Sequence, residues 1–391
     1  MDGEPISRFE ISAPTRIIFG AGVAGEIPAL VRCLGSRVLF VTGSKPERHL
    51  SIEAGIRNAP CAVTVFAVPT EPGIETVRRG VEMLEEFGAD VVVAVGGGSV
   101  LDAGKAIAAL AEAGDPVESY LEVVGLGRAI ERPGVACVAV PTTSGTGAEA
   151  TRNAVLGVPE QRVKVSLRSP FVLPRVAVVD PLLTVSMSPD LTASTGLDAL
   201  TQLIEAFVCM RFNPVVDAWC REGLRRISGS LREAYANGGN LCAREDLSLA
   251  SLLSGLSLAN AGLGAVHGFA GPIGGMYSVA HGAVCAALLP SVMEANLKAL
   301  SDRLPSHPAV KRYETVARLL TEDPQESAAG GVAWVRALCS SMSTRSLRAL
   351  GVSSDEFQKI SQKASAASSM KSNPVKLSHD ELVQILENAW D

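Results

Sequence analysis

The chain has 391 residues, of which 47% are hydrophobic, 19% are charged and only 4% are aromatic. This length is too great for one ordinary core, so we expect two domains whose cores are built from aliphatic side chains. The net charge of −6 is dispersed along the chain, and the lack of a basic stripe argues against a nucleic-acid partner.

The N-terminus, the apolar runs and the cysteines give expectations about the compartment. The segment Met1–Pro5 lacks the apolar core of a signal peptide, and runs such as 90–95 are too short to cross a bilayer. The eight cysteines contain no CxxC pair, which predicts inert, reduced core thiols. We therefore expect a cytoplasmic protein without a membrane partner.

Up to about residue 185, short β-branched runs alternate with segments of helical periodicity. Strands are predicted at 37–42, 61–68, 90–95, 136–140 and 176–179. Apolar residues at helical spacing predict a helix over 74–87, which Gly88 ends. This alternation predicts an α/β domain over residues 1–187, a doubly wound, Rossmann-like parallel sheet with ligands at the carboxyl ends of its strands.

Glycines and threonines follow two of these strands. Gly96-Gly97-Gly98-Ser99 comes directly after 90–95 and opens into a helix that runs to about Ala113. Bare backbone N–H groups at a helix N-terminus attract anions, although the spacing is not that of the common GxGxxG fingerprint. A second polar turn over 141–149 follows the next strand. Together the two turns could hold the pyrophosphate and nicotinamide ribose of a dinucleotide, whereas either alone could be an ordinary turn.

The end of the strand at 37–42 bears on the choice between NAD and NADP. An NAD enzyme often carries a carboxylate there to bind the ribose 2′-hydroxyl. This chain has Gly43 and Ser44 instead, and Lys45 or Arg48 could pair with a 2′-phosphate. The sequence therefore favours NADP or the use of both cofactors, and NAD alone remains open.

Near Ser188 the strand signals cease, and an all-helical domain is predicted over residues 188–391. Its first helix carries Asp198 and Gln202, with Asp190 as the expected N-cap. Further helices are predicted at 214–236, 244–262, 281–299, 309–321, 329–349, 354–367 and 378–389.

Four side chains of this domain form a candidate metal site. Asp198 and Gln202 are four residues apart and share a helix face, although such pairs are also common at surfaces and caps. His267 and His281 are two of only five histidines. Glycines and Pro272 are expected to break the chain between them into a helix, a crossover and a new helix, which would bring both rings to one point. Carboxylate, amide and imidazole donors suit a divalent first-row metal.

The motifs together resemble the iron-containing (group III) alcohol dehydrogenase family across nearly the whole chain. The matching pieces, in order, are 16–20, 96–99 with Asp102 and Lys105, 141–147, 164–170, 179–181, 198–201, His267-Gly268 to His281-Gly282, and 372–374. The resemblance implies a dehydroquinate synthase-like architecture, NAD or NADP, and one divalent metal, Fe²⁺ or Zn²⁺. It also implies a small alcohol or aldehyde substrate and a homodimer or larger homo-oligomer.

The resemblance also assigns roles to residues. The cofactor would contact Gly97, Gly98, Ser99, Asp102, Thr142, Thr143, Thr146, Lys164 and Leu183, in addition to Gly43 and Ser44. The metal ligands would be Asp198, Gln202, His267 and His281, of which Asp198, His267 and His281 are also the catalytic set. Two departures stand out, because the family usually has histidine where this chain has Gln202, and often where it has Gly271.

The implied reaction is a metal-assisted hydride transfer between a nicotinamide and an alcohol or carbonyl group. One alternative is a metal-independent reductase of the maleylacetate reductase type. Another is a cofactor-binding homologue that has lost catalysis, with Gln202 and Gly271 as its marks. Residues expected to line the substrate pocket are Thr151, Asn153, Phe269 and Met276.

Overall fold

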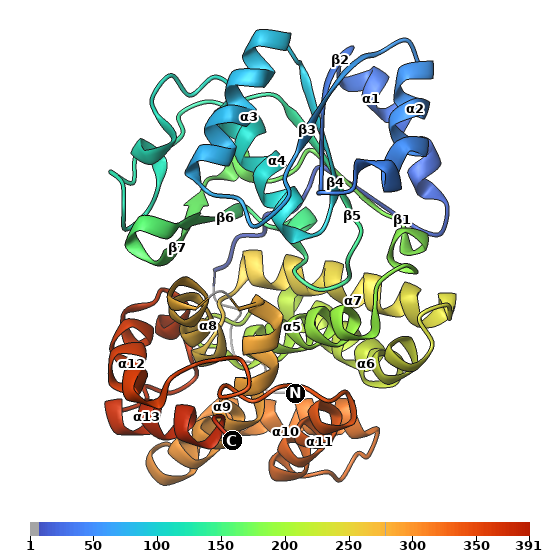
Figure 1. Ribbon diagram of the computed structural model, residues 1–391. Coiled ribbons are helices and arrows are strands. Elements are labelled where there is room, and N and C mark those ends of the chain that lie inside the picture. The colour runs from blue at the N-terminus through green and yellow to red at the C-terminus, as the bar shows by residue number, and fades with distance from the viewer. Residues whose placement is uncertain (1–7, 278) are drawn as a thin grey trace. The chain divides into compact units, whose positions relative to one another are not determined.

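The computed structural model describes residues 8–277 and 279–391, which form two compact units (Figure 1). One unit is Ala13–Ser186, and the other joins Met187–Asp391 with residues 8–12. These N-terminal residues were expected in the first domain. They group with the helical unit because the backbone of Ser12 exchanges hydrogen bonds of 2.6 and 2.7 Å with the Asn260 amide. The segment Met1–Pro5 lies outside the described residues.

The first unit is built on a parallel sheet that has six strands within the described residues, in the order β1-β8-β5-β4-β2-β3. The strands are β1 (Arg16–Phe19), β2 (Arg37–Thr42), β3 (Ala62–Ala67), β4 (Val91–Gly96), β5 (Ala136–Pro141) and β8 (Val176–Val179). All the predicted strands are present, and β1 is an addition. β4 is buried along its whole length, as expected for a central parallel strand.

Helices cover both faces of this sheet (Figure 1). They are α1 (Ile27–Leu34), α2 (Leu50–Asn58), α3 (Ile74–Phe87) and α4 (Gly98–Leu110). Side chains alternate along a strand, so Phe40 packs with α1 and α2 while its neighbour Leu39 packs with α3 and α4. The predicted doubly wound fold is thereby confirmed.

A short antiparallel hairpin, which the sequence did not predict, lies beside the large sheet. It consists of β6 (Asn153–Val158) and β7 (Val163–Arg168). Asp102 on α4 accepts a hydrogen bond of 3.0 Å from the Val155 backbone N–H and ties the hairpin to that helix. Its strands alternate buried positions with partly or fully exposed ones, and two short strands of this kind give a weak sequence signal.

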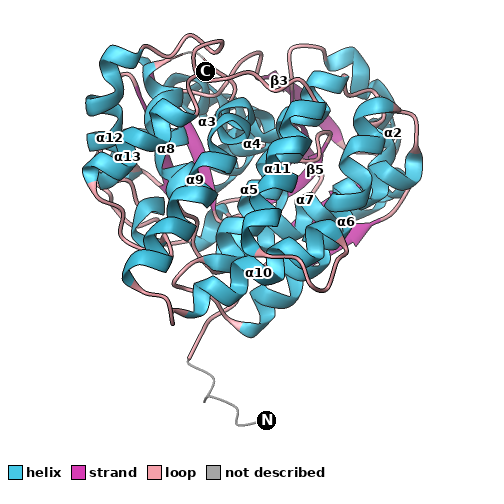
Figure 2. Ribbon diagram, turned by 90° about the horizontal axis from the view of Figure 1, so that it is seen from below, coloured by secondary structure: helices cyan, strands magenta, loops and turns pink. Residues whose placement is uncertain are grey.

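The regular elements of the second unit are all helices within its described residues (Figure 2). The helices are α5 (Pro189–Val208), α6 (Pro214–Ala236), α7 (Leu241–Asn260), α8 (Ala265–Met276), α9 (His281–Arg303), α10 (Pro308–Thr321), α11 (Ala328–Ser341), α12 (Phe357–Ala366) and α13 (His379–Asn388). The helix predicted over 329–349 is too long, since α11 ends before Ser343, whose positive φ of 51° reverses the chain.

The start of α5 and the course of α8 differ from the prediction. Ser188, rather than Asp190, caps α5, because its hydroxyl accepts from the Leu191 N–H at 3.3 Å. α8 continues through Pro272, and the chain breaks only after Met276. Phe269 and Ile273 on α8 are fully buried, and this burial offsets the hydrogen bond that a proline inside a helix removes.

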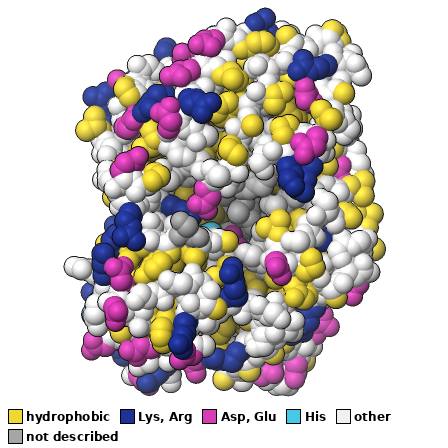
Figure 3. Space-filling model, in the orientation of Figure 1, with side chains coloured by type: hydrophobic (Ala, Val, Ile, Leu, Met, Phe, Trp, Pro, Cys, Tyr) yellow, Lys and Arg dark blue, Asp and Glu magenta, His cyan; other side chains and the backbone are white. Residues whose placement is uncertain are grey.

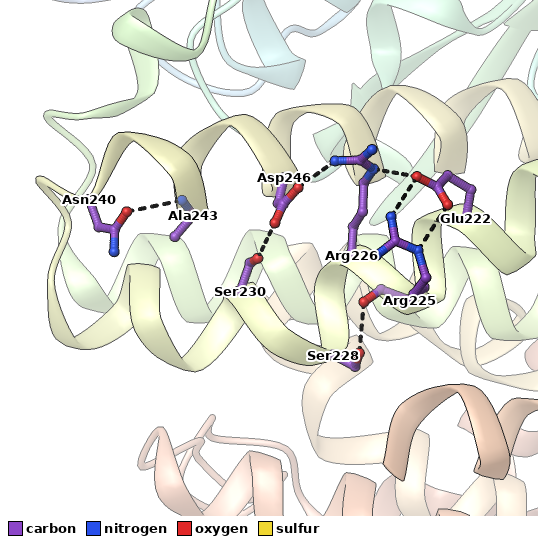
Figure 4. Close-up of polar contacts among 8 residues, drawn as sticks. All are labelled: Glu222, Arg225, Arg226, Ser228, Ser230, Asn240, Ala243 and Asp246. Carbon is purple, nitrogen blue, oxygen red and sulfur yellow. Dashed lines mark hydrogen bonds and ion pairs between the residues drawn. The ribbon is translucent and has the colours of Figure 1, made fainter. Parts of the chain in front are cut away.

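Ion pairs fasten α6 to α7, the helix that borders the candidate metal site (Figure 4). Arg226 on α6 bonds to Glu222 at 2.6 Å and to Asp246 on α7 at 2.5 Å. The Ser230 hydroxyl donates to the second oxygen of Asp246 at 2.7 Å. Asn240 caps α7 by accepting from the Ala243 N–H at 3.2 Å. The bonds from Arg226 and Ser230 to Asp246 hold α7 against α6.

α9 lies in the hydrophobic core of the helical unit. Its length and a mean hydropathy of 1.3 would allow it to cross a membrane, but 67% of its most apolar 18-residue stretch is buried inside the protein. Its apolar character is therefore explained by packing in the core.

The charged side chains bear on the expected lack of a nucleic-acid partner. On the face that Figure 3 shows, positive and negative side chains are interspersed without a basic stripe.

Candidate active site

The strand order places a topological switch point between β2 and β4. From β2 the chain moves outward to β3 and then returns to form β4 on the other side of β2. In open parallel sheets, ligands bind outside the carboxyl ends of the strands at such a point. Gly43 and Ser44 follow β2, and Gly97 follows β4, so three of the predicted cofactor residues lie at this place.

The two polar turns after β4 and β5 touch each other. The Thr142 N–H donates to the Gly96 carbonyl at 2.9 Å. A Cβ atom on Gly98 would lie 2.9 Å from Thr146 Cγ2, and one on Gly97 would lie 3.4 Å from the Thr143 side chain. α4 begins at Gly98, and no side chain caps it. Its first N–H groups, among them that of Ser99, are therefore available to an anion.

The remaining predicted cofactor residues have partners within the sheet unit. Asp102 pairs at 3.1 Å with the fully buried Lys105, in addition to its bond to the hairpin. Lys164 on β7 pairs with Glu71 at 2.7 Å. Leu183 follows β8 and is half-buried against the core beneath α1 and α2. Asp102 thus connects α4 to the hairpin, and Lys164 connects β7 to the segment that precedes α3.

In the helical unit, three helices bring four potential metal ligands together. They are Asp198 from α5, His267 from α8, and His281 and Cys285 from α9, and their ligand atoms all lie within 4.8 Å of one another. Asp198 Oδ1 is 3.4 Å from His267 Nε2 and 3.7 Å from His281 Nε2. The side chain of His281 is 37% exposed, so the cluster is accessible on that side.

Two atoms of this cluster are buried without a hydrogen-bond partner. They are Asp198 Oδ1 and His267 Nε2, on side chains that are 3% and 7% exposed. An unsatisfied buried polar atom costs about 1–3 kcal/mol, and more when it is charged. A divalent cation between them would satisfy both, since carboxylate oxygen and imidazole nitrogen are its usual ligands. The residues therefore fit a metal.

Glu205 orients His267. One carboxylate oxygen lies 2.6 Å from His267 Nδ1, and the other accepts from the Val266 N–H at 2.7 Å. With the proton on Nδ1, the lone pair of Nε2 faces the cluster, as in most metal-binding histidines. Glu205 was not predicted from the sequence, although its spacing of seven residues from Asp198 places both on one face of α5.

Gln202 lies on the other side of Asp198. Its amide nitrogen donates to Asp198 Oδ2 at 3.3 Å, and its amide oxygen accepts from the Ser254 hydroxyl on α7 at 2.9 Å. The oxygen of Asp198 that faces both histidines is the other one, Oδ1. Gln202 therefore borders the cluster and holds Asp198 in place.

Comparison with known families covers both units. The family described as iron-containing alcohol dehydrogenase matches residues 14–181, and the C-terminal part of the Fe-containing alcohol dehydrogenase family matches residues 192–390. The chain belongs to the iron-containing alcohol dehydrogenase family. It is a metal-dependent alcohol oxidoreductase that uses NAD(P) and a divalent metal. The alternatives of a metal-free reductase and an inert homologue are not favoured.

Individual relatives support the same family membership. The chain is 34% identical to 1,3-propanediol dehydrogenase of Citrobacter freundii, over 98% of this chain and 99% of that one. It is 36% identical to alcohol dehydrogenase 4 of Saccharomyces cerevisiae, over 82% and 81%. The crystal structure of a 1,3-propanediol oxidoreductase matches with a TM-score of 0.91 and 32% identity, over 98% of this chain and all of the other.

In the cluster of Asp198 and the two histidines, the neighbouring groups stabilise one another's charged forms. Burial disfavours the charged form of Asp198, but the neighbouring His281 and His267 outweigh it and lower the pKa of Asp198. Burial likewise disfavours a charged His267, yet Asp198 and Glu205 raise the pKa of His267 to about 10. Without a metal, a proton on His267 thus supplies the positive charge that the two carboxylates require.

Position 271, where the resemblance led us to expect a histidine, has no side chain and open space around it. A Cβ atom on Gly271 would meet nothing within 4 Å. Of the expected pocket residues, Phe269 and Met276 are buried in the helical core. Lys105 binds the hydroxyl of Thr151 at 2.9 Å and the carbonyl of Asn153 at 2.6 Å.

The eight cysteines are all free, but they are not all inert core thiols as predicted. Cys33 and Cys242 are exposed. Cys285 is fully buried and belongs to the metal cluster. Its pKa is raised well above the ordinary value, first by burial and then by the Asp198 carboxylate.

Proposed function

We propose that the protein interconverts a primary alcohol and its aldehyde, with Asp198, His267 and His281 as metal ligands. The pair of unsatisfied buried atoms, Asp198 Oδ1 and His267 Nε2, is the observation that carries this proposal. The two are 3.4 Å apart, and ligand atoms that each lie about 2.1 Å from one tetrahedral ion are about 3.4 Å apart.

Each residue has a defined part in the reaction. A divalent metal supplies a Lewis acid that lowers the pKa of the alcohol. Asp198 contributes negative charge, and Glu205 keeps the proton of His267 on Nδ1. In the sheet unit, the N–H groups at the start of α4 receive the cofactor pyrophosphate, and the threonine turn 142–146 orients the nicotinamide end. Because Gly271 has no side chain, the substrate proton leaves through water or a cofactor hydroxyl.

The substrate class follows from the relatives. Proteins similar to this chain are named for 1,3-propanediol, methanol and long-chain alcohols. Each of these compounds carries a hydroxyl group on a small or flexible carbon chain. We therefore place the substrate among primary alcohols and the corresponding aldehydes.

Metal analysis combined with a substrate panel tests the proposal. Protein purified without chelator should hold about one divalent ion per chain, reduce several aldehydes, and lose activity on chelation. Adding back Zn²⁺ or Fe²⁺ should restore the activity. Full turnover in metal-free protein would refute the assignment.

We further propose that NADP is accepted at least as well as NAD, because no carboxylate follows β2. Gly43 occupies the position of the usual acidic residue, and a Cβ atom there would have its nearest neighbour at 3.8 Å. Gly43→Asp should therefore fold normally and shift the ratio of catalytic efficiencies towards NAD by about tenfold or more, the worth of one charged hydrogen bond. Gly43→Ala is the control. An unchanged ratio in Gly43→Asp would contradict this role for the tip of β2.

Four further expectations concern assembly, compartment and partners. We propose a homodimer or larger homo-oligomer in the cytoplasm, with neither nucleic acid nor membrane as a partner. Light scattering of the purified protein measures the assembly directly. A monomer at micromolar concentration would contradict the first expectation, and co-sedimentation with anionic vesicles would contradict the last.

A further inference from the structure

We propose that Cys285 is the fourth protein ligand of the metal, in place of the histidine that the family usually has at position 202. This inference rests on the proposed function, because it concerns the same cation. Cys285 follows His281 by four residues on α9, so both side chains project from one face of that helix. Its sulfur belongs to the group of ligand atoms that lie within 4.8 Å of one another.

The arrangement around Asp198 favours Cys285 over Gln202. The two histidines approach Asp198 Oδ1, at 3.4 and 3.7 Å. Gln202 approaches the other oxygen, Oδ2, with its amide nitrogen, which cannot bind a metal. Its amide oxygen accepts from Ser254. Gln202 therefore fixes Asp198 from behind, and the fourth corner of the ligand set is supplied by α9.

Burial supports the same assignment. Cys285 is fully buried, and two other members of the group, Asp198 and His267, have unsatisfied atoms on side chains that are more than nine-tenths buried. A thiol in contact only with core side chains would be an inert hydrophobic group. Here the sulfur faces a carboxylate and two imidazoles, a combination typical of a metal site.

The chemistry of the donors has a consequence for the metal. Coordination replaces the thiol hydrogen of Cys285 by the metal and releases that proton to solvent. One thiolate, two imidazoles and one carboxylate form a softer set than three imidazoles and a carboxylate, and soft ligands favour zinc. With four protein ligands, a substrate oxygen would be added as a fifth ligand from the exposed side of His281.

X-ray absorption of the zinc-loaded full-length protein decides the matter. The expected spectrum contains one sulfur at about 2.3 Å besides nitrogen and oxygen ligands. The cobalt(II)-substituted protein should show a thiolate-to-cobalt charge-transfer band in the near ultraviolet. Both measurements use the native sequence, so they do not depend on the folding of a variant.

Three variants sharpen the test. Cys285→Ser should lose the sulfur signal and the charge-transfer band and bind zinc at least about tenfold more weakly. Gln202→Ala should keep both signals. Cys220→Ala, which removes another fully buried thiol of the helical unit, should match the native protein in all three measurements.

The outcomes separate this inference from the function on which it rests. A bound, active metal with only nitrogen and oxygen ligands would overturn the role of Cys285 and leave the dehydrogenase assignment standing. An active protein that holds no metal would overturn both.

Discussion

In the helical unit, the candidate metal centre consists of buried side chains, whereas the candidate cofactor edge of the sheet unit consists mainly of backbone. The side chains of Asp198 and His267 are buried, and Glu205 holds the ring of His267 in place. At the sheet edge, Gly97 and Gly98 lack side chains, and their N–H groups at the uncapped start of α4 are the proposed binding elements. The metal centre therefore depends on which side chains are present, whereas the cofactor edge depends on the lack of side-chain atoms at its glycines.

This difference predicts how each region fails. A buried polar cluster loses its function when one donor is replaced, because the others are left without compensation. A backbone cradle tolerates changes of side-chain chemistry but not of volume. Substitutions of the two kinds should therefore have separate signatures, one in metal content and the other in cofactor affinity.

The largest effect is expected for Asp198→Ala. Removing this carboxylate should abolish metal binding and reduce turnover by about a thousandfold or more, since several kcal/mol of Lewis-acid stabilisation is lost. Cofactor affinity, measured by nicotinamide fluorescence, should stay within about threefold, below one kcal/mol. Asp190→Ala, at an exposed position of the same helix, is the control. Native metal content in Asp198→Ala would show that the two regions do not differ as argued.

A smaller effect on the same region is expected for Glu205→Gln. The amide keeps the size of the side chain but removes the charge that supports His267, so metal affinity should fall about 10–100-fold. Competition with a chromophoric chelator measures this. Glu387→Gln, on the surface of the same unit, should leave the affinity unchanged. Equal affinities in both variants would remove Glu205 from the site.

At the sheet edge, Gly98→Ala should raise the Michaelis constant for the cofactor about tenfold while metal content stays native. The added methyl group would lie 2.9 Å from Thr146, and such overpacking costs about 1–3 kcal/mol. Gly25→Ala in the same unit adds a methyl group to open space and is the matched control. Loss of metal in Gly98→Ala would break the proposed separation.

The smallest effect concerns pH. In metal-free protein the pKa of His267 is about 10, above the ordinary 6.5, so its stabilisation is present below 6.5 and is lost as pH rises through about 10. Metal binding needs the neutral ring and should reverse this trend. Thermal unfolding of chelated and metal-loaded protein should therefore diverge by a few degrees as pH rises. Parallel curves would contradict the assignment.

Much of the fold was accessible from the sequence. β2 and α3 occupy the predicted ranges 37–42 and 74–87, and α6 occupies 214–236, because strong periodicity and clear turn residues mark these elements. The course of α8 was predicted wrongly, since a segment with Pro272 and several glycines has poor helix propensity, and only its burial against neighbouring helices keeps it helical as far as Met276.

Some residues of the candidate site could likewise be named from the sequence, and others could not. Asp198, His267 and His281 could be named from residue type and motif, as could the glycine and threonine turns. Glu205 was within reach, because it shares a face of α5 with Asp198. Cys285 was interpreted as an inert thiol, since nothing in its local sequence tells which helices lie opposite it.

The sequence by itself determined the class of fold, the family and the residue types that can hold a metal and a dinucleotide. These properties are local, since they follow from periodicity, turn chemistry and short motifs. Only the tertiary structure decided which atoms of the cluster face one another, that Gln202 turns towards Ser254, and that Cys285 lies among the potential ligands. Such contacts join residues up to 87 positions apart, and their geometry is set by helix packing rather than by neighbours in the chain.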